Sequence, residues 1–213
     1  MLKLSGIGFL LLSLGSLAAL GQEPPALEIF TSPDGNFQFI YPETYQLLVG
    51  ERILKATQGR RAGIPVCDFS TAEACVIYPV EVRGVEAPNT RFEGAGFSVH
   101  AVAGVAEELG CLTYADQIAQ SPGDRLPVTS IAINDRVFRH ATIRKTIAGH
   151  SQAADFYRTF LQQKCYELQI EVSLTDEPGV RKAVQSTSLG DPVADSARES
   201  LRLILSSVVF PQP

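Results

Sequence analysis

The sequence of 213 residues has no tryptophan, one methionine and three histidines. It also lacks the local motifs GxSxG, GxGxxG, HExxH, the P-loop and the EF-hand loop, which excludes the corresponding esterase, nucleotide, zinc and calcium sites. The segment Gly94-Ala95-Gly96 has no third glycine at the required spacing, so it predicts a bend before a strand. Basic residues cluster only at Arg60-Arg61 and the formal net charge is −5. We therefore expect no nucleic-acid partner.

Long apolar runs are also missing beyond the first residues. Ile7–Leu20 spans about 14 apolar or small residues, fewer than the roughly 20 that cross a bilayer. Lys3 precedes this run, and Ala19 and Gly21 stand where a signal peptidase requires small residues. Gln22 follows, not the cysteine of a lipoprotein. We expect a signal peptide at residues 1–21, no transmembrane span after its removal, and a periplasmic or secreted location.

Cysteine is scarce but even in number, with four residues. In an oxidising compartment this count predicts two disulfides, for which three pairings exist. We favour Cys67–Cys75, which closes a short loop, and Cys111–Cys165. The alternative is a metal site, but the cysteine spacings do not resemble the tight pairs of structural zinc sites. We therefore expect no metal and no cofactor, and we do not expect a cysteine nucleophile.

Strand signals dominate the rest of the chain. Residues 22–26 form a Pro-rich, flexible lead-in, and residues 27–213 are expected to be a single α+β domain. Leu27–Thr31 and Phe37–Tyr41, joined by the turn residues 32–36, predict a β-hairpin with both Phe and Tyr41 on one face. Alternation or β-branched content predicts further strands at Cys75–Val82, Phe97–Val102, Val128–Ile133, Arg136–Lys145, Phe156–Leu161 and Lys164–Val172.

Two segments have helical spacing. In the first, Val105–Gln120, the apolar stripe consists of Val105, Leu109, Leu112 and either Ala115 or Ala119. The second begins at the cap Asp191, with Pro192 at the first helical position. Its stripe is Val193, Ala197, Leu201, Ile204, Leu205 and Val208, and Asp195, Arg198, Glu199 and Arg202 are expected to lie away from it.

The alternation of side chains along the last predicted strand indicates on which face of the sheet the first helical segment lies. Alternation puts Cys165 on the face opposite Tyr166 and Leu168. A bond from Cys111 to Cys165 then places segment 105–120 on the second face or the edge of the sheet, and closing that loop contributes roughly 4 kcal/mol. We expect a twisted antiparallel sheet of about six to eight strands with helices on both sides.

Histidine is the residue type around which a hidden site would form. His100 and His140 lie in predicted strands beside polar neighbours, and His150 lies in a predicted loop. If the two strands are neighbours, His100 and His140 could bind a metal or transfer protons together with Glu93 or Asp135. The alternative is that these are imidazoles on an outer face of the sheet.

Three segments carry a resemblance. Asn36–Pro42 resembles the opening of PsbP/Mog1-type α/β domains, where an aromatic strand meets a Pro corner, and Leu205–Phe210 resembles the exit from their terminal helix. Lys164–Leu168 is similar to uncharacterised secreted bacterial proteins. The resemblance implies an antiparallel sheet between helices, in domains that mostly serve as assembly factors or binding modules. The insertion at 43–74 and the four cysteines depart from that pattern, and no binding residue is carried across.

Two functional hypotheses follow. The first is a non-enzymatic extracytoplasmic binding or assembly module for an envelope or extracellular protein or a small ligand, stabilised by disulfides. The second is a small secreted hydrolase whose site is assembled around His100 and His140. The sequence does not indicate the ligand, the partner or the oligomeric state.

Overall fold

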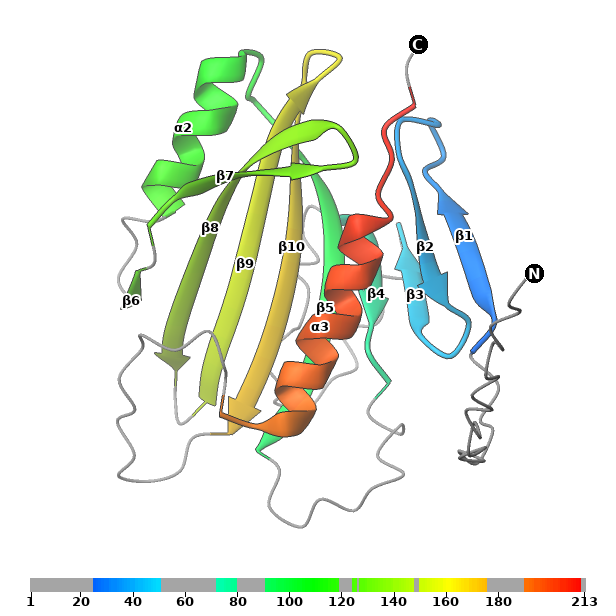
Figure 1. Cartoon of the computed structure of the whole chain (residues 1–213). Helices are drawn as coiled ribbons and strands as arrows, with labels where there is room; N and C mark the ends of the chain where they lie inside the picture. The colour runs from blue at the N-terminus through cyan, green and yellow to red at the C-terminus, as the bar shows by residue number, and fades with distance from the viewer. Residues whose placement is uncertain are drawn as a thin grey trace, which may run out of the picture.

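The computed structural model describes residues 25–50, 72–79, 91–118, 124–125, 127–147, 150–175 and 190–211. In these residues it shows an eight-stranded antiparallel sheet, a separate two-stranded sheet and two helices (Figure 1). The expected α+β class and strand number are therefore confirmed. The expected signal peptide at 1–21 and Cys67 lie outside the described residues, so the Cys67–Cys75 disulfide stays a prediction.

The large sheet has the strand order β3-β4-β5-β10-β9-β8-β6, and β7 also pairs with β8. Several boundaries differ from the sequence-based expectation, and residues 46–49 and 124–125 form strands that were not predicted. Residues 94–96 lie inside a strand, and His150 begins a strand where a loop was predicted, because the β8–β9 pairing extends to Ile147 and His150. The strands are β3 (Gln46–Val49), β4 (Ala72–Ile77), β5 (Phe92–Val102), β6 (Asp124–Arg125), β7 (Thr129–Ile133), β8 (Arg136–Ile147), β9 (His150–Leu161) and β10 (Lys164–Thr175).

The predicted N-terminal hairpin is confirmed as β1 (Leu27–Thr31) and β2 (Gln38–Pro42). Its turn contains Gly35 at a φ of 72°, a conformation that glycine adopts without strain. Phe37, Phe39 and Tyr41 are buried on the same face, as the alternation predicted. A backbone bridge between Gln38 and Val209 joins the hairpin to the segment that follows the last helix.

The last helix is the best-specified element of the chain. It is α3 (Pro192–Ser206), and the Asp191 side chain accepts hydrogen bonds from the backbone N–H groups of Val193 at 3.0 Å and Ala194 at 3.1 Å. The same carboxylate accepts from the N–H of Arg91 at 2.7 Å, which ties the start of α3 to the segment before β5. The helix packs over β10 and β5 (Figure 1). Its buried apolar residues are Ala194, Ala197, Leu201, Ile204 and Leu205.

The other helix, α2 (Glu108–Ile118), is held by the Cys111–Cys165 disulfide, which confirms that predicted pair. Because Cys165 points away from the core beneath α3, α2 lies on the opposite face of the sheet, where it contacts β8, β9 and β10. The predicted apolar stripe is wrong, since Leu109 is 73% exposed and Cys111 is fully buried. Residues two apart on a helix point in different directions, so the bond at Cys111 turns Leu109 outward.

Neither of these helices has the length and apolarity that a bilayer-spanning helix needs.

Removing the disulfide tests how α2 is held. The double variant Cys111→Ser/Cys165→Ser is expected to lose about 2–4 kcal/mol of unfolding free energy, because the denatured chain gains the freedom that a long closed loop had removed. Urea denaturation of the oxidised proteins measures the difference. Wild type treated with dithiothreitol is the parallel sample, and an unchanged midpoint in the double variant would contradict this role.

Candidate functional site

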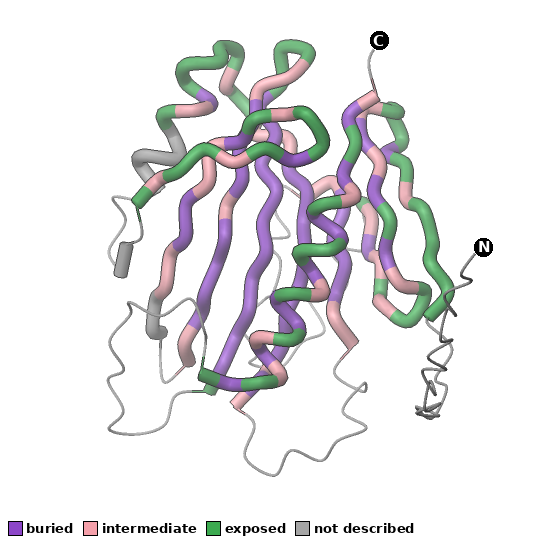
Figure 2. Tube along the Cα trace, viewed as in Figure 1, coloured by how far each residue is buried: buried purple, intermediate pink, exposed green. Residues whose placement is uncertain are grey.

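Strand β10 lies inside the sheet between β5 and β9, and it is buried on both faces from Cys165 to Leu174. Figure 2 shows the burial continuing along β5 and β9. The even-numbered residues of β10 join the apolar core beneath α3. The odd-numbered ones are mostly polar and lie on the other face with polar residues of β5 and β9. We call this surface the polar face; its members, each at most 9% exposed, are Ser98, His100, Gln152, Arg158, Glu167, Gln169, Glu171 and Ser173.

Strand register brings these side chains into rows that run across the sheet. His100, Glu167 and Arg158 occupy opposed positions on β5, β10 and β9. Ser98 is opposite Gln169, and Gln152 is opposite Ser173. Directly opposed residues of an antiparallel pair have neighbouring side chains. The polar face is therefore a set of cross-strand contacts rather than a scatter of polar residues.

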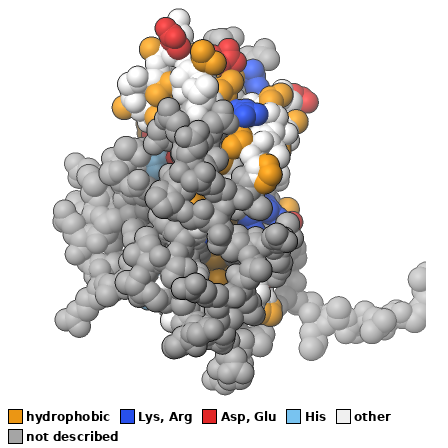
Figure 3. Space-filling model, turned by 90° about the vertical axis from the view of Figure 1, so that its left-hand side faces the viewer, with side chains coloured by type: hydrophobic (Ala, Val, Ile, Leu, Met, Phe, Trp, Pro, Cys, Tyr) orange, Lys and Arg blue, Asp and Glu red, His pale blue; other side chains and the backbone are white. Residues whose placement is uncertain are grey.

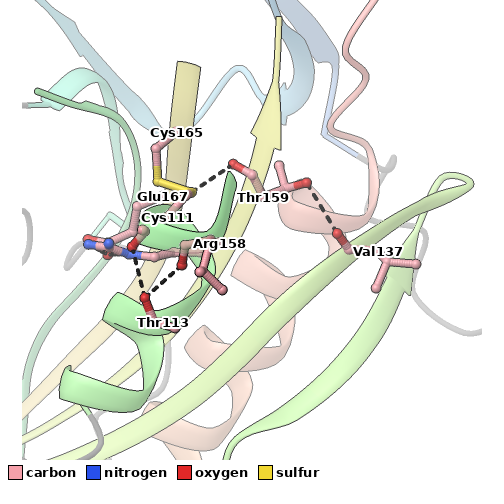
Figure 4. Close-up of a disulfide and its surroundings, with 9 residues drawn as sticks. Cys111, Thr113, Val137, Arg158, Thr159, Cys165 and Glu167 are labelled. Carbon is pink, nitrogen blue, oxygen red and sulfur yellow. Dashed lines mark hydrogen bonds and ion pairs between the residues drawn. A yellow bond between two sulfur atoms is a disulfide. The ribbon is translucent and has the colours of Figure 1, made fainter. Parts of the chain in front are cut away.

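The first contact is an ion pair. The Glu167 carboxylate accepts from Arg158 Nε and lies 2.5 Å from Arg158 Nη2, with the two side chains 11% and 3% exposed. The pair is next to the Cys111–Cys165 bond, and the Cys111 sulfur contacts the carbonyl of Thr159 (Figure 4). The cost of removing two charges from water offsets most of their attraction, so such a pair adds little net stability.

Side-chain amides form the second group of contacts. Glu171 accepts hydrogen bonds from Gln152 Nε2 and from Gln169 Nε2, the latter at 3.2 Å. The Ser98 hydroxyl and His100 Nε2 are 2.8 Å apart. These contacts hold the amide and imidazole groups in fixed positions inside the protein.

At one end the polar face reaches solvent. His150 Nδ1 is 2.8 and 2.9 Å from the two carboxylate oxygens of Glu93, and Thr175 donates to the same carboxylate at 3.0 Å. His150 and Glu93 are 30% and 28% exposed. We call these three residues the rim. His150 and Thr175 form the row after Gln152 and Ser173, and Glu93 contacts both.

A second buried cluster lies on the opposite face, around Asp155 of β9. Arg198 of α3 donates to both oxygens of Asp155 at 2.6 to 2.9 Å, and Thr142 donates at 2.6 Å. The expectation that Arg198 lies away from the apolar stripe is wrong, since it is buried. The long apolar stem of an arginine can follow the helix into the core while its guanidinium reaches a carboxylate.

The Asp155 contacts set its protonation. Burial by itself raises the pKa of Asp155, but hydrogen bonds from His140, Arg198 and Thr142 and the charge of Arg198 outweigh it, so the pKa lies well below the ordinary range. His140 is stacked on Tyr157 with ring centroids 4.6 Å apart, and its Nε2 is 3.6 Å from Asp155. Because Asp155 remains ionised and bound to Arg198, the cluster anchors α3 to the sheet.

The structure separates the two histidine candidates. β10 and β9 lie between the strands of His100 and His140, and the two side chains are on opposite faces. Glu93 contacts His150 instead, and Asp135 is in the β7–β8 turn. Within the described ranges, no three His, Cys, Asp or Glu side chains gather as a metal site would require. His100 and His140 therefore remain separate candidates for binding.

Most residues of the polar face were not singled out from sequence. The alternation in Lys164–Val172 located Glu167, Gln169 and Glu171 on one face, but such a pattern usually indicates a solvent-facing side. Arg158 and Gln152 belong to a strand whose start was predicted too late. To predict the polar face, one would also have needed to know which residues of β5 and β9 pair with each residue of β10.

The described surface seen from the side of β8 and α2 mixes hydrophobic, acidic and basic side chains, with no extended region of one charge in the part that is coloured (Figure 3). The coloured part of this view therefore does not indicate a charged interface.

A scan against protein-family models finds no match, and a search of curated proteins also finds none. A Bacteroides thetaiotaomicron protein is similar with a TM-score of 0.47 and 10% identity over 86% of this chain, which spans 48% of that protein. LpqN, "involved in cell envelope biogenesis of Mycobacterium tuberculosis", is similar with a TM-score of 0.45 and 11% identity. The match covers 89% of this chain and 87% of LpqN. The PsbP protein of Synechocystis sp. is similar with a TM-score of 0.40 and 11% identity. The match covers 93% of this chain and 99% of that protein. PsbP, which the opening segment resembles, is thus among the similar structures.

Acid stability tests the Asp155 cluster. The folded pKa of Asp155 is below its unfolded value of about 4, so the stabilisation is complete above that pH and is lost as pH falls below it. Asp155→Asn removes the negative charge that faces the buried Arg198 guanidinium, so we expect a loss of about 3 kcal/mol at pH 7 and a weaker dependence of stability on pH below about 4. Urea denaturation at a series of pH values between about 2 and 7 measures both the loss of unfolding free energy at about pH 7 and its change in acid. The pH range in which the stabilisation is lost is expected to agree to within about one pH unit.

The matched control is Glu199→Gln, also on α3 but 68% exposed. It is expected to change stability by less than about 0.5 kcal/mol. Equal effects of the two substitutions would show that Asp155 does not anchor the helix.

Proposed function

We propose that this chain is a non-enzymatic, extracytoplasmic binding module, and that the polar face holds the groups that bind. The observation that supports this most is the chemistry of the second sheet face. Apolar residues of similar size at Arg158 and Glu167 would pack there at no loss of stability, and often with a gain. A buried ion pair and amide network in such a place is better explained by recognition of a polar ligand.

The extracytoplasmic location is supported by chemistry of the same region. The Cys111–Cys165 bond is buried beside the polar face, and disulfides persist in oxidising compartments. The signal peptide expected at residues 1–21 supports the same location. Oxidation therefore holds α2 next to Arg158 and Glu167 where the module would work.

A hydrolase built around His100 and His140 has less support. General acid–base chemistry needs its groups within hydrogen-bond reach of one substrate, and these two imidazoles are on opposite faces of the sheet. Asp155, the carboxylate near His140, is bound by Arg198 on both oxygens. The Asp155 carboxylate is therefore already engaged in the contact that anchors α3.

The test separates binding from stability. In Arg158→Met/Glu167→Met the ion pair is replaced by apolar side chains of similar length. We expect unfolding free energy equal to or above wild type, because two buried charges are removed together. We also expect loss of bound ligand, measured by native mass spectrometry of protein recovered from an oxidising compartment, where wild type should release a small molecule on activation.

The single variant Glu167→Met is the control for the pair. It leaves Arg158 buried beside an apolar group and is expected to cost about 3–5 kcal/mol. If the double variant is also destabilised by that amount and wild type carries no releasable molecule, the polar face is a stabilising element and the binding function is refuted.

A further inference from the structure

We infer that Gln152 and Ser173 form a subsite of the polar face that accepts hydrogen bonds from hydroxyl or ammonium groups of a small polar molecule. This inference rests on the proposed binding function and specifies the chemistry of its ligand. It is carried by two buried polar atoms and by the shape of the neighbouring rows.

The first observation concerns hydrogen bonds. Gln152 Oε1 and Ser173 Oγ are buried, and neither has a hydrogen-bond partner among the residues that the structure describes. The two residues are 6% and 1% exposed. They are also directly opposite each other on β9 and β10. More than nine in ten buried polar groups in proteins have a partner, so two adjacent exceptions indicate a site that a further molecule completes.

The chemistry of that molecule follows from the groups already used. The Gln152 amide nitrogen donates to Glu171, and so does the amide nitrogen of Gln169. What Gln152 still offers is therefore an acceptor, the oxygen Oε1. The Ser173 hydroxyl can accept as well as donate. A ligand that brings N–H or O–H groups complements this pair, and one that brings only acceptors does not.

The second observation is that the described residues opposite Ser173 and Glu171 on β5, and opposite Glu171 on β9, are small. On β5, Gly94 is opposite Ser173 and Gly96 is opposite Glu171, and on β9 Ala154 is opposite Glu171. The segment predicted as a bend is thus a strand whose two glycines add no side chain of their own to the polar face. Glycine in a strand often marks a site where a ligand or another backbone approaches closely.

The rim gives the subsite its connection to solvent. Thr175 and His150 are opposed in the row that follows Ser173 and Gln152, and Glu93 contacts both. Since His150 and Glu93 are partly exposed, this row is where a small molecule would reach the subsite.

The test compares Ser173→Ala with wild type in the full oxidised chain. The probes are myo-inositol, which supplies hydroxyl donors, putrescine, which supplies ammonium donors, and acetate, which only accepts. We expect a donor probe to bind wild type, and Ser173→Ala to bind it about tenfold more weakly. The ligand-free variant should be as stable as wild type or more so, because a buried hydroxyl without a partner is removed. Calorimetric titration and thermal melting provide the two readouts.

The matched control is Ser32→Ala, in the turn of the N-terminal hairpin and also buried, but with its hydroxyl hydrogen-bonded to Asp34 and to the backbone N–H of Phe37. It is expected to lower stability and to leave probe binding unchanged. The probe that binds distinguishes a hydroxyl from an ammonium ligand. Binding of acetate alone, no response to any probe, or an equal response of both alanine variants would overturn the subsite.

Failure here is distinguishable from failure of the proposed function. A releasable molecule that is lost in Arg158→Met/Glu167→Met but retained in Ser173→Ala would leave the binding module standing and remove only this subsite.

Discussion

The constraint on which the structure depends is the burial of β10 on both faces. A strand alternates its side chains, so two buried faces need two sets of partners. One set is apolar, and Tyr166, Leu168 and Ile170 belong to the core cluster that also contains Leu201 and Ile204 of α3. The other set is polar, and its ion pair and amide contacts cross the strands to Arg158 and Gln152. The two helices then have different roles because they lie on chemically different faces.

Specific contacts hold each helix in place. α3 is held by its apolar stripe, by the Asp191 cap and by the Arg198–Asp155 pair in the core. Of the residues of α2 whose side chains the structure describes, only Cys111 is buried, and it is bonded to β10. The face beneath α3 is apolar apart from the Asp155 cluster. The polar face combines a disulfide with a buried ion pair and an amide network, and we propose that this network serves recognition.

Much of the fold could be predicted from the sequence because it follows from local rules. The cap and stripe of α3, the aromatic hairpin and the parity that placed Cys165 opposite Leu168 all come from short-range periodicity. The errors share one cause. Leu109, Arg198 and His150 were misplaced because their environments are set by partners distant in the chain. The alternation of β10 identified a polar side correctly, but only the complete sheet shows that this side is buried.

The central claim is that the polar face is completed by a hydrogen-bond donor from outside the chain. The most direct measurement is an atomic-resolution crystal structure of the oxidised protein as isolated from its own compartment. The account predicts density for a bound small molecule with a donor atom within hydrogen-bond distance of Gln152 Oε1 and Ser173 Oγ. A structure in which both atoms are satisfied by groups of the chain itself, with no molecule beside them, would contradict it.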